Sequence, residues 1–337
     1  MKVETPYFWF RLFKTHGIGT KSLALIAEEL KNHQLQPEKL SLNSRKLSAQ
    51  CPELAKIING KIRAEDSERI YDEYQTLKRA EITILHPSRP DFPRHLFEIS
   101  PILFLKGQRK LLASDGVAIV GARNVSDMGI QVAKEIAAGL AREGMNVVSG
   151  YAKGVDSTAH LAALEADGTT TLVLPYGINE LRKKREFKKY NWKQDVLAVS
   201  QFSPDAKWLA RNAMIRNKLI CALSKAVVVI ESGPERDAKG KMSGTFDTGK
   251  TALEMKLPLF VVDPKYYDDS SKGNADLIAL DGRKIDPFNG IRDIVSYFEK
   301  TKSKKPCDTT INANDVTYVQ TDFLTDPQVS TESNTTA

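Results

Sequence analysis

Cysteine is scarce in this sequence of 337 residues, and long apolar runs are missing altogether. The three cysteines, Cys51, Cys221 and Cys307, are too few and too scattered for a disulfide framework or a zinc ribbon, and they fit a reducing compartment. No window approaches about 18 consecutive apolar residues, which excludes a membrane-spanning helix. The first residues lack the apolar core and the cleavage site of a signal peptide. We therefore expect a cytoplasmic protein that contacts no membrane, and no metal site.

Charge, in contrast, is plentiful and unbalanced. Lysine and arginine number 49 against 42 aspartate and glutamate residues, so the formal net charge is +7. This excess permits a polyanionic partner without establishing one. Hydrophobic residues make up 41% of the chain, which is enough to bury a core. The length exceeds what a single core usually serves, which favours two domains.

The two ends of the chain differ from its middle. We expect a small all-helical domain at residues 1–78, because apolar residues recur at helical spacing over residues 22–30. Two helices around Gly17-Ile18-Gly19 resemble a helix-hairpin-helix or SAM-like module, which can hold DNA phosphates on backbone N–H groups. An ordinary helical turn that ends in glycine is the alternative. Residues 301–337 are polar and lack any period, so we expect a disordered tail.

Residues 79–300 alternate apolar strands with helices. Four prolines within residues 87–101 make an extended connector that cannot be helical throughout. The alternation predicts right-handed crossovers and a doubly wound, mostly parallel α/β sheet, with ligands at the carboxyl ends of its strands. Strands are expected at residues 82–85, 117–120, 147–149, 171–174, 196–199, 226–231 and, as the last, 258–262, and helices at 130–142, 157–166, 213–223 and 245–255.

The first loop after a strand carries Gly121, Arg123 and Ser126. Gly121 allows a sharp turn, and Ser126 or Asp127 can cap the next helix, whose free N–H groups attract an anion. Arg123 adds a guanidinium fork that matches phosphate, although a salt bridge within the fold is the alternative. The spacing is not G-x-G-x-x-G, and no acidic residue follows the second strand. We therefore expect no dinucleotide and no other cofactor.

The second such loop carries Gly150, Lys153 and Gly154. The two glycines let the backbone approach a ligand closely, and Lys153 supplies positive charge. Asp156 and His160 follow four residues apart on one helical face. They could form an acid/base pair, but no nucleophile is evident nearby, which favours a structural role: Asp156 as a helix cap and His160 packed beside it.

A basic run follows at residues 181–193, with seven basic residues, one acidic residue and three aromatic residues. Aromatic rings stack on bases while lysine and arginine hold the backbone of a nucleic acid. The run is therefore a candidate DNA-contact loop, with a solvated charged face as the alternative. Its candidate contact residues are Lys183, Lys184, Arg185, Phe187, Tyr190 and Trp192.

Taken together, these segments resemble the DprA/Smf family (DNA processing protein A). The family's core runs from an apolar strand into G-x-R-x-x-S-x-x-G, and then through S-G-x-A-x-G-[IV]-D-x-x-A-H, R-N-x-[IL]-I-x-x-L-S and S-G-[ST]. The resemblance covers residues 93–282. This chain carries the motif residues in the same order: Gly121, Arg123, Ser126, Gly129, Ser149, Gly150, Ala152, Gly154, Asp156, Ala159, His160, Arg216, Asn217, Ile220, Leu223, Ser224 and Ser243-Gly244-Thr245.

The resemblance implies an extended Rossmann-like fold that binds single-stranded DNA without base specificity, protects the strand and helps to load a RecA-type recombinase. It also implies a homodimer formed through the Rossmann-like domain. The implied strand-binding pocket is lined by Arg123, Ser126, Gly150, Lys153 and Gly154, with Asn217 and Lys218 near it. The winged-helix-like C-terminal domain of many members is not apparent here. This departure, and a charged insertion at residues 234–242, leave transformation, phage defence and plasmid maintenance all open.

The alternative is a nucleotide-hydrolysing Rossmann enzyme or a defence-associated DNA or nucleotide sensor. Residues 244–251 satisfy G-x-x-x-x-G-K-[ST], but a phosphate loop must follow its strand directly, and we expect Thr245 to open a helix instead. An N-glycosidase would need a glutamate three residues after Thr245, where Thr248 stands. We therefore expect no catalytic residue and a binding protein rather than an enzyme.

Overall fold

The computed structural model describes residues 4–40, 51–58, 61–63, 66–267 and 271–303. Residues up to Tyr297 form one compact unit, and a second unit begins at Phe298, within the last helix. That helix, α11 (Gly290–Ser303), runs three residues into the stretch expected to be a tail. The rest of the expected tail lies outside the described residues. The expected boundary between domains near residue 78 stays a prediction.

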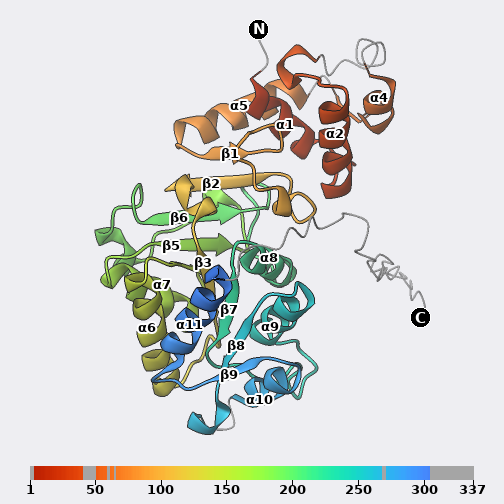
Figure 1. Cartoon of the computed structure of the whole chain (residues 1–337). Coiled ribbons are helices and arrows are strands. Elements are labelled where there is room, and N and C mark those ends of the chain that lie inside the picture. Colours follow the sequence, from red (N-terminus) through yellow and green to blue (C-terminus); the bar gives the residue numbers. More distant parts are fainter. Residues whose placement is uncertain (1–3, 41–50, 59–60, 64–65, 268–270, 304–337) are drawn as a thin grey trace, which may run out of the picture. The chain divides into compact units, whose positions relative to one another are not determined.

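A sheet of nine strands forms the centre of the described structure, in the order β1-β2-β6-β5-β4-β3-β7-β8-β9 (Figure 1). The strands from β3 to β9 pair in parallel, while β2 pairs antiparallel with both β6 and β1. The α/β fold class predicted from the sequence is thereby confirmed. The strands are β1 (Thr83–Leu85), β2 (Leu103–Gly107), β3 (Gly116–Val120), β4 (Asn146–Ser149), β5 (Thr170–Leu174), β6 (Val196–Ser200), β7 (Ala226–Val229), β8 (Leu259–Val262) and β9 (Arg283–Ile285).

The central strands are buried on both faces, because helices cover each side of the sheet. Every residue of β3 to β8 is buried, as continuous apolar runs require in a parallel sheet. Helices α6, α7 and α11 lie along one face and α8, α9 and α10 along the other (Figure 1). The crossover helices are α6 (Asp127–Arg142), α7 (Val155–Glu165), α8 (Ala210–Ala222), α9 (Gly244–Glu254) and α10 (Lys272–Ala279).

The expectation that residues 258–262 form the last strand is wrong. The short strand β9 follows and pairs in parallel with β8. Two of its three residues, Arg283 and Lys284, are exposed and charged, so no apolar run announces it. Strand β2, which follows the proline-rich connector, is not among the strands expected from the sequence.

The described parts of the N-terminal region consist of helices joined by turns, as expected, with a 3-10 turn at Pro37–Lys39. Its aromatic helix α1 packs on the antiparallel edge of the sheet, where the rings of Phe10 and Phe104 meet edge to face at 6.0 Å. The indole N–H of Trp9 donates to Ser88 Oγ at 2.9 Å. One apolar core therefore continues from these helices onto the sheet. The helices are α1 (Thr5–Lys14), α2 (Thr20–Asn32), α4 (Pro52–Ile58) and α5 (Asp66–Arg79).

The order of the strands creates a switch point beside β3. The chain runs from β3 through β4, β5 and β6 to one side, then returns as β7 to the other side of β3. Loops at the carboxyl ends of these neighbouring strands diverge there, which is where open α/β sheets bind their ligands. A ligand-binding site is therefore expected at the loops after β3, β4 and β7.

Candidate nucleic-acid interface

The loops after β3 and β4 are packed directly against each other. Gly154 has a φ of +83°, and a Cβ at this position would overlap the carbonyl oxygen of Ala122. The backbone N–H of Val155 donates to that same oxygen at 3.3 Å. Only glycine allows so close a contact in this conformation. The two loops that the sequence identified separately are thus brought together, and they carry Arg123 and Lys153 on the same edge of the sheet.

Arg216 reaches these loops from α8 and lies against Gly150. A Cβ on Gly150 would overlap Nη1 of Arg216, so the missing side chain makes room for the guanidinium. Arg216 is only 6% exposed, and its Nε has no hydrogen-bond partner among the described residues. Such a group is expensive to bury unless something satisfies it. We call Arg123, Gly150, Lys153, Gly154 and Arg216 the strand-end site.

Two more charged groups lie near Arg216: Asp156, which is buried, and Lys184, which is half-buried and acts on Asp156. Burial raises the pKa of Asp156, while the positive charge of Arg216 acts in the opposite direction. Burial likewise lowers the pKa of Lys184, and the Asp156 carboxylate opposes that change. Asp156 is thus the buried carboxylate that acts on Arg216, and it also faces the charge of the half-buried Lys184.

His160 is a packed, neutral histidine. Its Nδ1 lies 2.6 Å from the Thr170 hydroxyl, which donates to the carbonyl of Val147. Nδ1 must therefore carry the hydrogen, and the buried Nε2 has no partner in the described structure. Burial lowers the pKa of His160 to about 3. Asp156 accepts instead from the backbone N–H of Ala152 at 3.3 Å, so the two side chains are held by different partners.

Lys184 attaches the basic run to the loop after β4. Its Nζ donates to the carbonyl of Tyr151 at 3.0 Å and to Ser157 Oγ at 2.5 Å. Its backbone N–H donates to the Tyr151 hydroxyl at 2.9 Å, and its Nζ lies 4.3 Å from the centre of that ring. The run therefore lies next to the strand-end site, but Lys184 itself is committed to contacts within the protein.

The stacking role expected of Phe187 and Trp192 is wrong. Both rings are buried, at 0% and 6% exposure, and the indole N–H of Trp192 donates to the Phe187 carbonyl at 3.1 Å. Their alternation with charges reflects a loop that inserts its aromatic rings into the core. Tyr190 is half-buried beneath Lys189. Lys183, which lies 4.4 Å from the Trp192 ring, and Arg185 remain on the surface.

The start of α6 does not offer the anion site that the sequence suggested. The buried carboxylate of Glu231 accepts from the Ser126 backbone N–H at 3.0 Å and from its hydroxyl at 2.7 Å. Ser126 Oγ in turn accepts from Gly129 N–H at 3.0 Å, which caps the helix. A side chain of the protein thus occupies this helix end, and Ser126 has a capping role here. Gly121, at the start of the same loop, packs closely on Val155.

Asn217 and Lys218 lie apart from Arg216 on α8. The Asn217 amide donates to the Gly244 carbonyl at 3.1 Å and to Asp247 at 2.9 Å, so it ties α8 to the start of α9. Lys218 follows Arg216 by two positions, about 200° around the helix, on the exposed side. The contact with a DNA strand that the resemblance implies for Asn217 stays a prediction, beside the helix-linking role that the structure shows.

Arg123 and Lys153 are the exposed side chains of the strand-end site. Arg123 and Lys153 form no ion pair with any described residue. The Arg123 guanidinium carbon lies 5.7 Å from the centre of the Trp208 ring. Sequence reasoning did not select Trp208 or commit to Arg216 as site residues. The signal for Trp208 would have been a large aromatic residue in a short loop just ahead of a helix that carries Arg211, Arg216 and Lys218.

The phosphate-loop pattern has no loop. Residues Gly244–Glu254 form α9, whose N-cap Ser243 accepts from Phe246 N–H, so the pattern lies within helical turns as expected. Lys250, the residue that would contact a phosphate, pairs instead with Glu235 at 3.2 Å.

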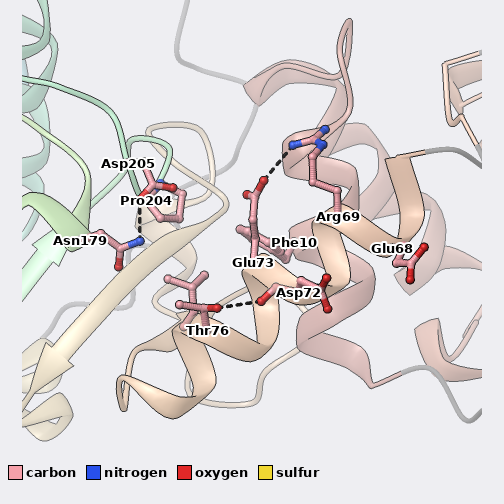
Figure 2. A pocket seen from close by; sticks show the side chains of 10 residues that line it. Phe10, Glu68, Arg69, Asp72, Glu73, Thr76, Asn179, Pro204 and Asp205 are labelled. Carbon is pink, nitrogen blue, oxygen red and sulfur yellow. Dashed lines mark hydrogen bonds and ion pairs between the residues drawn. The ribbon is translucent and has the colours of Figure 1, made fainter.

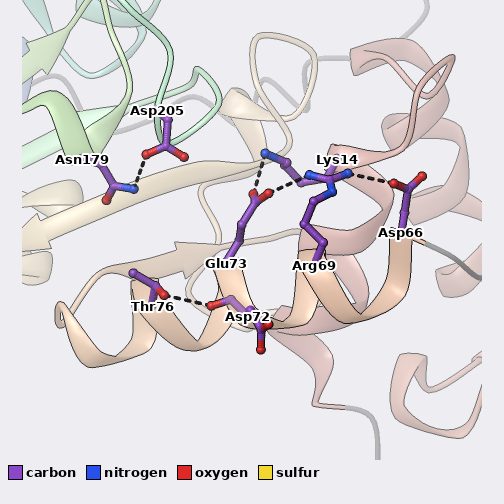
Figure 3. Close-up of polar contacts among 8 residues, drawn as sticks. All are labelled: Lys14, Asp66, Arg69, Asp72, Glu73, Thr76, Asn179 and Asp205. Carbon is purple, nitrogen blue, oxygen red and sulfur yellow. Dashed lines mark hydrogen bonds and ion pairs between the residues drawn. The ribbon is translucent and has the colours of Figure 1, made fainter.

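An acid-lined cavity of 580 Å³ lies between α5 and the loops that carry Asn179 and Asp205 (Figure 2). Arg69 lies between Asp66 and Glu73, and Lys14 also pairs with Glu73, at 2.6 Å (Figure 3). An acidic lining repels a polyanion. The acidic residues that line it are Glu68, Asp72, Glu73 and Asp205.

Glu29, His33 and Cys51 place three possible metal ligands within 4.8 Å of one another. His33 is exposed and pairs with Glu29 at 3.3 Å, so two of the three groups already satisfy each other. No helix in the described part of the chain is long and apolar enough to cross a membrane.

A doubly wound, mostly parallel sheet with glycine turns at its strand ends defines a Rossmann-like protein. The family model for DNA recombination-mediator protein A matches residues 81–298, which is well over half of the sequence. The chain belongs to this family, and the expected DprA/Smf resemblance is confirmed.

Curated relatives agree with this assignment. DNA processing protein DprA of Streptococcus pneumoniae is 30% identical over 236 residues, which cover 69% of this chain and 79% of the relative. Protein Smf of Synechocystis is 32% identical over 184 residues, or 52% of this chain and 44% of that relative. The aligned part thus spans less than half of the longer Smf protein.

Solved structures share the fold. DprA of S. pneumoniae superposes with a TM-score of 0.68 at 24% identity, and covers 87% of this chain and 98% of that chain. DprA of Helicobacter pylori superposes with a TM-score of 0.53 at 26% identity, and covers 66% and 97%. The H. pylori structure concerns that protein's single-stranded DNA binding mode.

Proposed function

We propose that this chain binds single-stranded DNA without base specificity and acts in the recombination step that loads a RecA-type recombinase on the strand. One observation carries the proposal. The buried Arg216 guanidinium lies against Gly150, its Nε has no hydrogen-bond partner among the described residues, and the exposed cations Arg123 and Lys153 lie on the neighbouring loops. A backbone phosphate supplies the anion that this arrangement lacks.

Membership in a recombination-mediator family and the DNA-binding H. pylori relative support DNA as the anion. Contacts to phosphates position a strand but carry no sequence information, which supports binding to all sequences alike. The exposed Lys183 and Arg185 of the adjacent basic run lie where they can extend the path of the strand.

The test is a mobility-shift titration with single-stranded and double-stranded oligonucleotides of one sequence at two salt concentrations. We expect a preference for the single strand and an affinity that falls steeply with salt. Arg123→Ala and Lys153→Ala weaken binding to every sequence to a similar degree. Lys110→Ala is the matched control, because it removes an exposed charge just before β3, at the opposite edge of the sheet. Undetectable binding at low salt contradicts the proposal.

The homodimer and the recombinase contact are separate parts of this proposal. Light scattering on the purified chain tests the dimer through its molar mass. Assembly of a RecA filament on strands coated with single-strand binding protein, with and without the chain, tests loading. An unchanged assembly rate would remove the recombinase from the proposal and leave DNA binding standing.

A further inference from the structure

A tryptophan remains in water beside the cations of the strand-end site. Trp208 is 49% exposed, and the next residue, Leu209, is 44% exposed. The other two tryptophans of the sequence are buried, Trp9 at 0% and Trp192 at 6%. Exposure of a large ring leaves apolar area unburied, so packing within the fold does not account for its place.

The Trp208 ring lies next to the guanidinium of Arg123, a group suited to binding phosphate. The Arg123 guanidinium lies over it, 5.7 Å from its centre, at a distance suited to a cation–π contact. Arg123 forms no ion pair with a described residue, so its charge is available beside the ring. An aromatic surface next to an arginine fits a nucleotide unit, which carries a flat base and a phosphate close together.

We propose that Trp208 is the base-stacking residue of the site and determines its preference for single strands over duplexes. The inference rests on the proposed function, that the chain binds DNA. Arg123, Lys153 and Arg216 recognise phosphates, which both forms of DNA present. A base can lie on the Trp208 ring only when it is unpaired, because a duplex keeps the faces of its bases stacked inside. Stacking is tolerant of base identity, so the ring adds selectivity for strandedness without sequence specificity.

Tryptophan emission gives a direct readout, because Trp208 is the tryptophan that solvent reaches. We expect oligo(dT) to quench the emission of the full chain and to protect the quenched fraction from acrylamide. An abasic oligonucleotide of equal length, with the same phosphates and no bases, leaves the emission nearly unchanged. Bound oligo(dT) without any change in emission would overturn the inference.

Substitutions separate the ring from the charges. Trp208→Ala lowers the affinity for oligo(dT) by about 10-fold, while the affinity for duplex and for the abasic strand changes little. Trp208→Phe keeps an aromatic face and restores most of the lost affinity. Phe288→Ala is the matched control, because it removes an equally exposed ring, 52% exposed, from the loop after β9. It leaves every affinity unchanged.

The failure of this inference is distinct from the failure of the proposed function. If the wild-type chain binds oligo(dT) and Trp208→Ala binds it equally well, the inference is wrong and DNA binding stands. If the wild-type chain binds no DNA, both are wrong. Equal losses for oligo(dT) and for the abasic strand in Trp208→Ala would show that the ring only positions Arg123, which also overturns the inference.

Discussion

Two charged regions of this molecule, the acid-lined cavity and the strand-end site, differ in how completely their charged side chains are paired. The acid-lined cavity beside α5 is a hollow of 580 Å³, and the strand-end site is formed by loops packed against a buried arginine. In the cavity, Glu73 is paired with both Lys14 and Arg69, and Asp205 accepts from Asn179 at 2.8 Å. At the strand ends, Arg216 is buried with an unpartnered Nε.

The two regions therefore differ in how their charges are satisfied: the buried Arg216 keeps an Nε without a hydrogen-bond partner among the described residues, whereas both carboxylate oxygens of Glu73 are in ion pairs. In the cavity Glu73 is paired, and the exposed carboxylates Glu68 and Asp72 keep contact with water, so burial sets no cost that a ligand would have to offset. A buried guanidinium has given up its water, and only a nearby anion compensates for that loss. Substitutions in the two regions should therefore have very different effects.

The largest effect is expected for Arg216→Gln. It removes the cation opposite the buried Asp156, and we expect a loss of about 3 kcal/mol in the free energy of unfolding together with loss of DNA binding. Urea unfolding and mobility shift measure the two effects.

The double variant Asp156→Asn with Arg216→Gln separates stability from binding. It removes both buried charges, so most of the lost stability returns while binding stays absent. Full DNA affinity in either variant would contradict the role given to Arg216.

Gly150→Ala should come next, because its Cβ overlaps the Arg216 guanidinium. The guanidinium must move, and we expect at least ~10-fold weaker DNA binding and a stability loss of about 1–2 kcal/mol. Gly233→Ala, whose Cβ meets nothing within 4 Å, is the control in the loop after β7. Similar effects of both substitutions would show that the close contact at Gly150 has no special role.

The pH dependence of stability should differ between His160, which lies near Arg216, and Glu4, which binds Tyr74 and Lys78 of α5. His160 keeps its neutral form in the fold because burial lowers its pKa to about 3 from an ordinary 6.5. Its contribution is complete above pH 6.5 and declines as the pH falls toward 3, by up to about 1.4 kcal/mol per pH unit. On the helical side, hydrogen bonds from Tyr74 and Lys78 lower the pKa of Glu4 below 4.5, so stability is lost there only at more acidic pH.

Urea midpoints of the wild type and His160→Gln between pH 7 and pH 5 check this expectation, because the variant should lose the dependence. Parallel curves for the two proteins would contradict the assignment of a buried neutral imidazole.

The smallest effect belongs to the cavity. Glu68→Gln and Asp72→Asn each remove an exposed carboxylate, and we expect unfolding free energies within about 0.5 kcal/mol of the wild type and unchanged affinity for DNA. A loss of affinity like that of Arg123→Ala would place DNA near the cavity and reverse the comparison.

Local sequence patterns predicted most of the sheet. The apolar runs of β3 to β8 and the helical periods between them identified the parallel core, because strands buried on both faces contain few polar residues. The sequence pattern does not predict strand β9, because the strand is three residues long and two of them are exposed. Its place depends on pairing with β8, which no local pattern encodes.

The site was predictable in outline only. The rule that ligands meet the carboxyl ends of strands selected the loops of Arg123 and Lys153, which the structure packs against each other. It did not reveal that Glu231 caps α6 through Ser126, a contact between residues 105 positions apart. Nor could it show that Phe187 turns inward. Such pairings are set by tertiary packing, which overrides the character of a loop read alone.

The most direct test is a structure of the chain bound to a short oligo(dT) strand. The account predicts a backbone phosphate within hydrogen-bonding distance of the Arg216 guanidinium at Gly150, with Arg123 and Lys153 on neighbouring phosphates. A strand bound elsewhere, with the Arg216 guanidinium still without an anion, would contradict it.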